Sequence, residues 1–232
     1  MAQQIILALI GGVLPALVWL FFWLREDNKN PEPRRLILRT FLLGMAAVIL
    51  VLPLQNGVEV IFTGSVTFVT LLLWAALEEV LKFFAGYFGG LSSREDNEPV
   101  DPMIYMITAA LGFVALENTL FILGPLLGGD LGQSIVTGNL RFVGASLLHI
   151  AASGVIGVFL SFSFYKSKWV RIWAGLNGLA VAIIFHDAFN FAIIKYGDTG
   201  TYYAFLAVWI VIIALLLVFE RVKALRAPNT GL

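Results

Sequence analysis

Three charged residues lie inside an apolar run that is otherwise suited to a membrane helix. The run LLWAALEEVLKFF, residues 72–84, contains Glu78, Glu79 and Lys82, and the preceding residues 60–77 carry no charge. An ionised side chain near the middle of a membrane helix costs about 2.5–3.5 kcal/mol on insertion scales, so such groups usually face a bundle interior or a water-filled cavity. The run therefore predicts a membrane protein with a polar site inside it.

The composition agrees with this prediction. The chain is 59% hydrophobic and 13% charged, with a mean hydropathy of +0.90, whereas soluble domains carry about 25% charged residues. A net charge of zero gives no indication of a nucleic-acid partner, and the lack of Cys excludes a disulfide framework and a thiol nucleophile. We predict one helical membrane domain over residues 1–232, with its core motifs within 60–194.

Apolar runs predict an all-α, polytopic transmembrane helix bundle of about seven spans. The predicted spans cover residues 4–24, 36–54, 60–89, 102–125, 137–164, 169–194 and 201–222. The third and fifth are long, which predicts that they tilt or project from the bilayer.

The distribution of Lys and Arg predicts the orientation of the chain, because cytoplasmic loops are enriched in these residues. Only Arg141 and Lys195 fall on one side of the predicted spans, and Lys82 lies within a span. The other twelve fall on the opposite side: Arg25, Lys29, Arg34, Arg35, Arg39, Arg94, Lys166, Lys168, Arg171, Arg221, Lys223 and Arg226. This imbalance predicts an external N-terminus and a cytoplasmic C-terminus.

Two connections between the predicted spans have a distinctive composition. The connection over 91–102 carries four carboxylates and is predicted to be a solvated connector, with Pro102 beginning the next helix. The external connection over 124–139 is rich in Gly and is predicted to be a plain linker, with a mobile lid as the alternative.

Ionisable residues recur in the central part of three further predicted spans. Glu117, His149 and His186 lie there, and the two histidines are the only ones in the chain. Asn190 is four residues after His186 and shares its helix face, whereas Asp187 lies on another face and is predicted to be structural. The alternative is that such residues only join helices.

Carboxylates and imidazoles in a wet pocket can activate water for hydrolysis, and a second imidazole or an amide can stabilise an oxyanion. The same atoms suit zinc, held by His149 and His186 with Glu78 or Glu117. Two alternatives stay open: a proton-coupled transporter that uses these residues as a relay, and a structural ion pair between Lys82 and Glu78. The predicted catalytic residues are Glu78, Glu79, Glu117, His149, His186 and Asn190.

Five motifs in this order resemble the PrsW family of intramembrane proteases, which is related to the CAAX prenyl endopeptidases and the bacteriocin-processing membrane proteases. The motifs are NPEPRRLILRTFLLG, EEVLK (EExxK), EPVDPMIY with GFVALEN, RFVGASLLHIAASGVIG, and HDAFN (HxxxN). Phe113 to Glu117 reads FxxxE as in PrsW, whereas the CAAX group has FxxxH. Pro102 and Met103 depart from the family pattern, in which an acidic or small residue is expected.

The resemblance implies an intramembrane endopeptidase of a bacterial or archaeal cytoplasmic membrane. Its partners would be the lipid bilayer and a membrane-anchored protein substrate, notably an anti-sigma factor, and the oligomeric state is left open. The family is often described as metalloproteases, whereas the related CAAX enzymes are thought to act without metal. We favour a metal-free mechanism with Glu78 as base, because Lys82 on the same helix face would repel a cation.

Overall fold

The structure is a computed structural model that describes residues 1–27, 30–62 and 67–227, and in this part of the chain all regular structure is helical. The predicted all-α class is confirmed. The elements are α1 (Ala2–Glu26), α2 (Arg34–Ile61), α3 (Phe68–Gly86), η1 (Tyr87–Leu91), α4 (Asp101–Leu127), α5 (Leu131–Leu140), η2 (Arg141–Ala145), α6 (Ser146–Phe162) and α7 (Lys168–Lys223).

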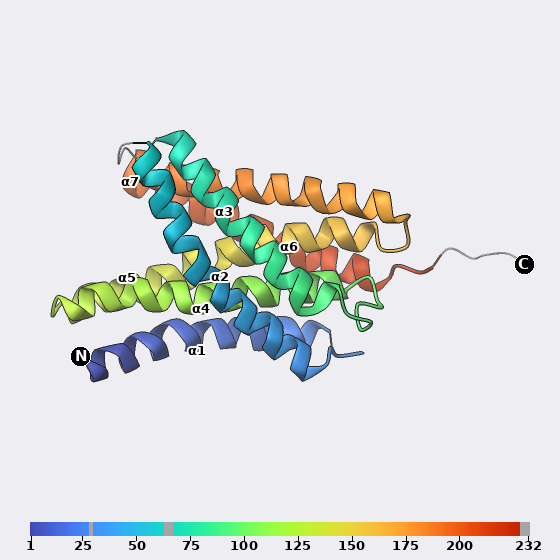
Figure 1. Cartoon of the computed structure of the whole chain (residues 1–232), viewed down its shortest axis with the longest axis horizontal. Coiled ribbons are helices and arrows are strands. Elements are labelled where there is room, and N and C mark those ends of the chain that lie inside the picture. Colours follow the sequence, from blue (N-terminus) through green and yellow to red (C-terminus); the bar gives the residue numbers. More distant parts are fainter. Residues whose placement is uncertain (28–29, 63–66, 228–232) are drawn as a thin grey trace, which may run out of the picture.

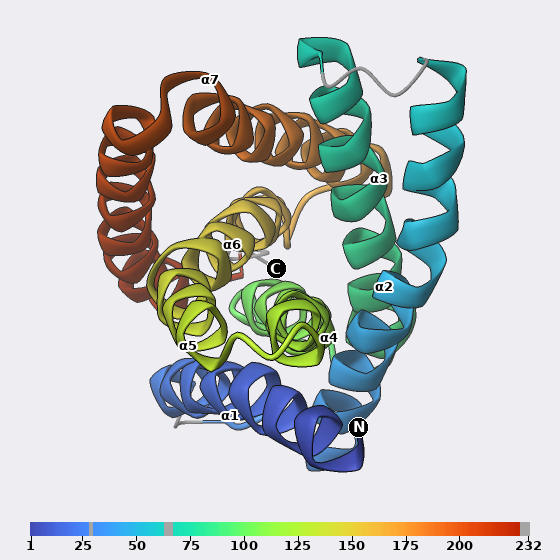
Figure 2. The same ribbon diagram turned by 90° about the vertical axis from the view of Figure 1, so that its left-hand side faces the viewer.

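The helices form a bundle around α4 and α6. Figure 2 shows these two helices enclosed by α1, α2, α3 and α7. Every residue of α4 from 101 to 115 is buried, whereas large apolar side chains of α1 and α7 are exposed on the outside of the bundle. Since an exposed apolar surface of this extent suits lipid rather than water, α1 and α7 have the surface of membrane-facing helices.

Glycine allows the inner helices to cross closely. A Cβ atom on Gly112 of α4 would overlap the carbonyl oxygen of Phe41 in α2, and a Cβ atom on Gly157 of α6 would lie 2.6 Å from the Cα atom of Met103 in α4. Small residues at such crossings let two backbones approach within membranes. These contacts bring α2 and α6 against opposite parts of α4, and the cavity described below lies among them.

Five helical segments of the described chain are long and apolar enough to cross a membrane: Ala2–Glu26, Arg34–Ile61, Asp101–Leu127, Leu131–Phe162 and Lys168–Lys223. The last of these is interrupted at Gly197, whose backbone is non-helical with φ 55° and ψ −131°. Figure 1 shows that the two arms of α7 run in opposite directions. The chain is a multi-pass helical membrane protein, and the count of seven separate crossings stays a prediction.

Two predicted boundaries are wrong. Residues 60 and 61 belong to the end of α2 rather than to the third span, and α3 begins only at Phe68, after the hydroxyl of Thr67 has accepted a hydrogen bond from the Thr70 amide. The connection over 124–139 is mostly helical rather than a linker. Its second helix, α5, starts where the Asp130 carboxylate accepts a hydrogen bond of 2.8 Å from the Gln133 amide.

The acidic connection before α4 is only partly the solvated loop that was predicted, because Glu95 is exposed whereas the side chains of Asp96 and Asp101 are buried. Asp96 lies 2.5 Å from Arg171 of α7, and burial raises the pKa of Asp96 to about 6 against the opposing effect of that guanidinium. Asp101 is 1% exposed, and its Oδ2 accepts hydrogen bonds from the Asn97 and Glu98 amides at 2.8 and 2.6 Å. These contacts bury carboxylates that composition alone assigned to water. Pro102 lies in the first turn of α4, as predicted.

Candidate active site

A cavity of about 520 Å³ opens between α2, α3, α4, α6 and α7. Its polar and ionisable lining includes Gln55, Glu78, Glu117, Arg141, His149, His186 and Asn190. Five of the six residues predicted from the sequence therefore line one cavity. The sixth, Glu79, is fully buried behind the cavity wall and is absent from the lining.

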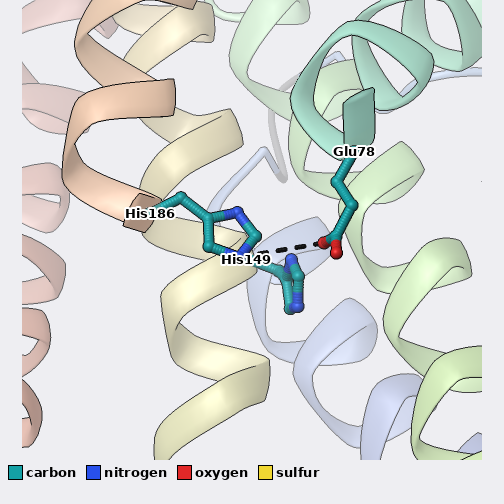
Figure 3. Close-up of side chains that lie close together, drawn as sticks. All are labelled: Glu78, His149 and His186. Carbon is teal, nitrogen blue, oxygen red and sulfur yellow. Dashed lines mark ion pairs between the residues drawn. The ribbon is translucent and has the colours of Figure 1, made fainter. Parts of the chain in front are cut away.

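Glu78, His149 and His186 converge from three different helices, as Figure 3 shows. Each offers one ligand atom, and these atoms all lie within 4.8 Å of one another. Glu78 Oε2 is 3.7 Å from His186 Nε2, and the two imidazole rings stand almost perpendicular with their centres 5.0 Å apart. The three residues are at most 7% exposed, so they form a compact polar centre within an apolar bundle.

Glu79 and Lys82 hold the two histidines from behind. Glu79 Oε1 lies 2.5 Å from Lys82 Nζ and 2.7 Å from His186 Nδ1, while Lys82 Nζ lies 2.7 Å from His149 Nδ1. The suggested pairing of Lys82 with Glu78 is wrong, because Lys82 pairs with Glu79. Adjacent residues point in different directions on a helix, so Glu78 faces the cavity while Glu79 faces the packed interior.

A second set of polar contacts lies on the other side of His149. Its Nε2 atom is 3.1 Å from Glu117 Oε2, and that carboxylate also pairs with the Arg141 guanidinium. Arg141 Nε donates to Asn118 Oδ1 at 2.5 Å, and Asn118 Nδ2 donates to Ser146 Oγ at 3.1 Å. Asn118 thereby helps to orient Arg141 beside Glu117.

Gln55 is a further site residue, which was not predicted from the sequence. Its amide Nε2 donates a hydrogen bond of 2.9 Å to Glu78 Oε1, whereas Glu78 Oε2 is buried without a hydrogen-bond partner. Gln55 directly follows the predicted span 36–54, and a polar residue at the end of that span was the feature of the sequence that could have indicated it. Arg141 was counted as an external cation and as the first residue of the motif that contains His149, but it was not predicted as a site residue, although it lines the cavity.

Asn190 and Asp187 differ in their relation to the cavity, although both lie close to His186 in α7. Asn190 is among the lining residues. Asp187 is not, and it is 2% exposed with its Oδ1 atom lacking a hydrogen-bond partner. Its predicted structural role stays a prediction.

Comparison with known proteins agrees with this arrangement. Residues 32–218 match the model of the PrsW family of intramembrane metalloproteases. The chain belongs to the PrsW family. It is 27% identical to Protease PrsW of Geobacillus kaustophilus, over 86% of each chain, and 27% identical to Protease PrsW of Bacillus subtilis, over 78% of this chain and 80% of the relative. No solved structure matches the chain.

Family membership makes the chain an intramembrane endopeptidase. The family match spans every element from the residues before α2 to the second arm of α7, and so includes the whole cavity. It also decides between the two function classes that the buried residues allowed, in favour of proteolysis over proton-coupled transport.

The potential ligands in the cavity, Glu78, His149 and His186, fit a metal ion. Two imidazoles and a carboxylate are typical ligands of catalytic zinc. His186 can donate its Nδ1 hydrogen to Glu79, which leaves the Nε2 lone pair facing the partnerless Oε2 of Glu78. His149 has Lys82 at one nitrogen and Glu117 at the other, so it must exchange one of these contacts to bind a metal.

Proposed function

We propose that this chain cleaves a peptide bond of a membrane-anchored protein, using water activated between Glu78, His149 and His186. The observation that carries the proposal is the convergence of these three buried residues, from three helices, to ligand atoms within 4.8 Å in a chain of an intramembrane protease family. Reacting groups that are held close together inside an apolar bundle favour hydrolysis. Their positioning and the local electrostatics both lower the activation barrier of the reaction.

Metal-assisted hydrolysis is the route that this donor set supports best. Glu78, His149 and His186 would hold the ion, which when bound lowers the pKa of a water molecule to about 7 and polarises the scissile carbonyl. Lys82 repels a cation at Glu78 less than its place on the same helix face suggested, since it is paired with Glu79 at 2.5 Å rather than directed at Glu78.

The protein groups around this centre divide the remaining tasks. Glu79 fixes the ring of His186 through Nδ1, and Lys82 fixes the ring of His149. Glu117 lies beside His149 and can accept a proton as the reaction proceeds. The amide of Asn190 lines the same cavity and can donate to the oxyanion that develops on the substrate.

A metal-free route uses the same atoms. Glu78 Oε2 is buried and has no hydrogen-bond partner, so it can take a proton from water directly as a general base. The contact between Lys82 and His149 favours this route, because a nitrogen that accepts from Lys82 is not free to bind a metal. Chelation distinguishes the two routes.

We further propose that residues 1–232 form one protease domain with seven crossings, an external N-terminus and a cytoplasmic C-terminus in a bacterial cytoplasmic membrane. Support comes from the reversal of α7 at Gly197, which gives this helix two antiparallel arms, and from the imbalance of twelve Lys and Arg residues against two. By resemblance, the substrate is a single-span protein of the anti-sigma-factor type.

The decisive test is cleavage of a single-span peptide by the purified protein in lipid nanodiscs, with and without a zinc chelator. The metal-assisted route predicts that chelation abolishes cleavage and that added zinc restores it. Unchanged cleavage under chelation would establish the metal-free route instead. No cleavage of any single-span peptide, together with proton-coupled solute uptake in vesicles, would overturn the proposed function.

A further inference from the structure

A second group of ionisable residues lies away from the cavity, at the end of the bundle where α1 ends and α2 and α4 begin. Asp27 follows α1, Glu32 precedes α2, and Asp101 is the first residue of α4. Each offers one carboxylate oxygen, and these oxygens lie within 4.8 Å of one another. Three segments far apart in the sequence thus bring three acids together.

Two of these carboxylates are buried with an oxygen that has no partner. Asp27 is 5% exposed and Asp101 is 1% exposed. Asp27 Oδ2 and Asp101 Oδ1 are inaccessible and accept no hydrogen bond from the residues that the structure describes. Burying a carboxylate oxygen without a hydrogen-bond partner costs free energy. Two such oxygens in one cluster therefore point to a positively charged ligand.

Within the described ranges, hydrogen-bond donors reach other oxygens of the cluster. The Asn97 and Glu98 amides donate to Asp101 Oδ2 at 2.8 and 2.6 Å, and the hydroxyl of Tyr105 donates to Glu32 Oε2. These bonds fix the orientation of two carboxylates, while Asp101 Oδ1 keeps no hydrogen-bond partner among the described residues.

No lysine or arginine within the described ranges forms an ion pair with any of the three acids. The nearby Lys223 instead pairs with Glu26 at 3.4 Å and with Glu220 at 2.8 Å. The cluster therefore lacks the cationic partner that the central site has in Lys82 and Arg141.

We propose that Asp27, Glu32 and Asp101 bind a hard divalent cation, Mg²⁺ or Ca²⁺. An all-oxygen, carboxylate donor set is the one that these ions prefer, and it contains no imidazole or thiolate for a softer metal. Oxygens on opposite sides of Ca²⁺ are about 4.6–5.2 Å apart, so a cluster no wider than 4.8 Å accommodates this ion. Opposite oxygens on Mg²⁺ are about 4.0–4.2 Å apart, so the cluster would have to contract slightly around that ion.

The ion would tie the end of α1 to the beginning of α4 and to the chain that leads into α2. None of the three ligands lines the catalytic cavity, so this site is separate from the peptidase centre. Its expected effect is on the stability of the bundle end, through preferential binding of the ion to the folded state.

The test uses the full chain in nanodiscs, stripped of divalent ions, with Tb³⁺ as a luminescent probe for oxygen-ligand sites. Tyr105 hydrogen-bonds to Glu32 and is placed to sensitise the bound probe. We expect saturable Tb³⁺ emission that is lost when Ca²⁺ or Mg²⁺ is added in competition. Whichever of these two ions displaces Tb³⁺ at the lower concentration is the one that the site prefers. The same ion should raise the thermal unfolding midpoint.

Four variants, two at the cluster and two controls elsewhere, make the assignment specific. Asp27→Asn and Glu32→Gln keep side-chain shape and should weaken binding at least tenfold. Glu95→Gln removes an exposed carboxylate from the connection before α4 and should leave binding unchanged. His186→Ala should also leave it unchanged, because that residue belongs to the central site.

Two outcomes would overturn the proposal. The first is the absence of saturable binding of Tb³⁺, Ca²⁺ or Mg²⁺ by the folded wild-type chain. The second is binding by Asp27→Asn and Glu32→Gln equal to that of the wild type. A higher unfolding midpoint of Asp27→Asn at neutral pH, with no cation effect on the wild type, would show that protons neutralise the cluster.

Discussion

The two buried acidic centres of this molecule are neutralised in different ways. In the central site, carboxylates alternate with cations and imidazoles: Glu79 pairs with Lys82, and Glu117 pairs with Arg141 and contacts His149. At the bundle end, Asp27, Glu32 and Asp101 come together without a lysine or arginine among the described residues. The first centre is balanced by the fold itself, and the second depends on what the solution supplies.

This difference explains why the central site can keep charged groups deep in an apolar bundle. A buried ion pair is stable only when further hydrogen bonds satisfy both partners. Lys82 has Glu79 and His149 within 2.7 Å, and its ammonium also lies 5.1 Å from the centre of the Phe113 ring. Glu78 and Glu79 each keep one buried oxygen without a hydrogen-bond partner. Of the two, only Glu78 lines the cavity, so its free oxygen is the one that can act on a substrate or a water molecule there.

The largest effect is expected from Glu78→Gln, which removes that charge and keeps the side-chain shape. Cleavage should fall by about 10²–10⁴-fold, as for loss of a general base, or further if a metal ligand is lost. The measurement is the cleavage rate of a single-span peptide in nanodiscs, with thermal unfolding as a check on the fold. Cleavage within threefold of the wild type would remove Glu78 from the mechanism.

Lys82→Met should unfold the central site rather than only inactivate it. Breaking a buried ion pair by removing one partner commonly costs about 3–5 kcal/mol, because the other charge stays buried. Both Lys82 and Glu79 are fully buried, so the full penalty applies. Denaturant unfolding in detergent measures it. The double variant Lys82→Met/Glu79→Gln should recover part of the loss, and failure to do so would argue that the two residues are not coupled.

Gln55→Ala should have a smaller effect, on rate rather than on folding. Its amide orients Glu78 without lying at the reacting atoms, and loss of such a supporting hydrogen bond typically costs about 10–100-fold in metal affinity or activity. Gln133→Ala, at an exposed position of α5, is the matched control and should cleave normally. If Gln55→Ala cleaves like that control, the hydrogen bond to Glu78 has no role in activity.

Which features of the structure can be predicted from the sequence depends on the kind of interaction that forms them. Hydrophobic runs predict the helices, and the cost of burying charge predicts that Glu78, Glu117, His149 and His186 share a polar centre. The pairing of Lys82 with Glu79 rather than Glu78 was not predictable, since both spacings occur on one helix face. Asp101 could not be assigned to the interior either, because its burial depends on amides of the preceding turn and on residues far away in the chain.

The smallest effect on the cleavage rate is expected from Asp187→Asn. This substitution tests whether burial alone makes a carboxylate functional. Asp187 is as buried as His149 but has neither the cationic partners of the central site nor the neighbouring acids of the end cluster. Because it does not line the cavity, its substitution should change cleavage by less than about threefold, whereas Asn190→Ala should lose an oxyanion donor, worth about 10²-fold or more. Side-by-side cleavage rates of the two variants test this. A loss in Asp187→Asn equal to that in Asn190→Ala would mean that Asp187 acts through the adjacent His186, and would extend the catalytic centre to a second face of α7.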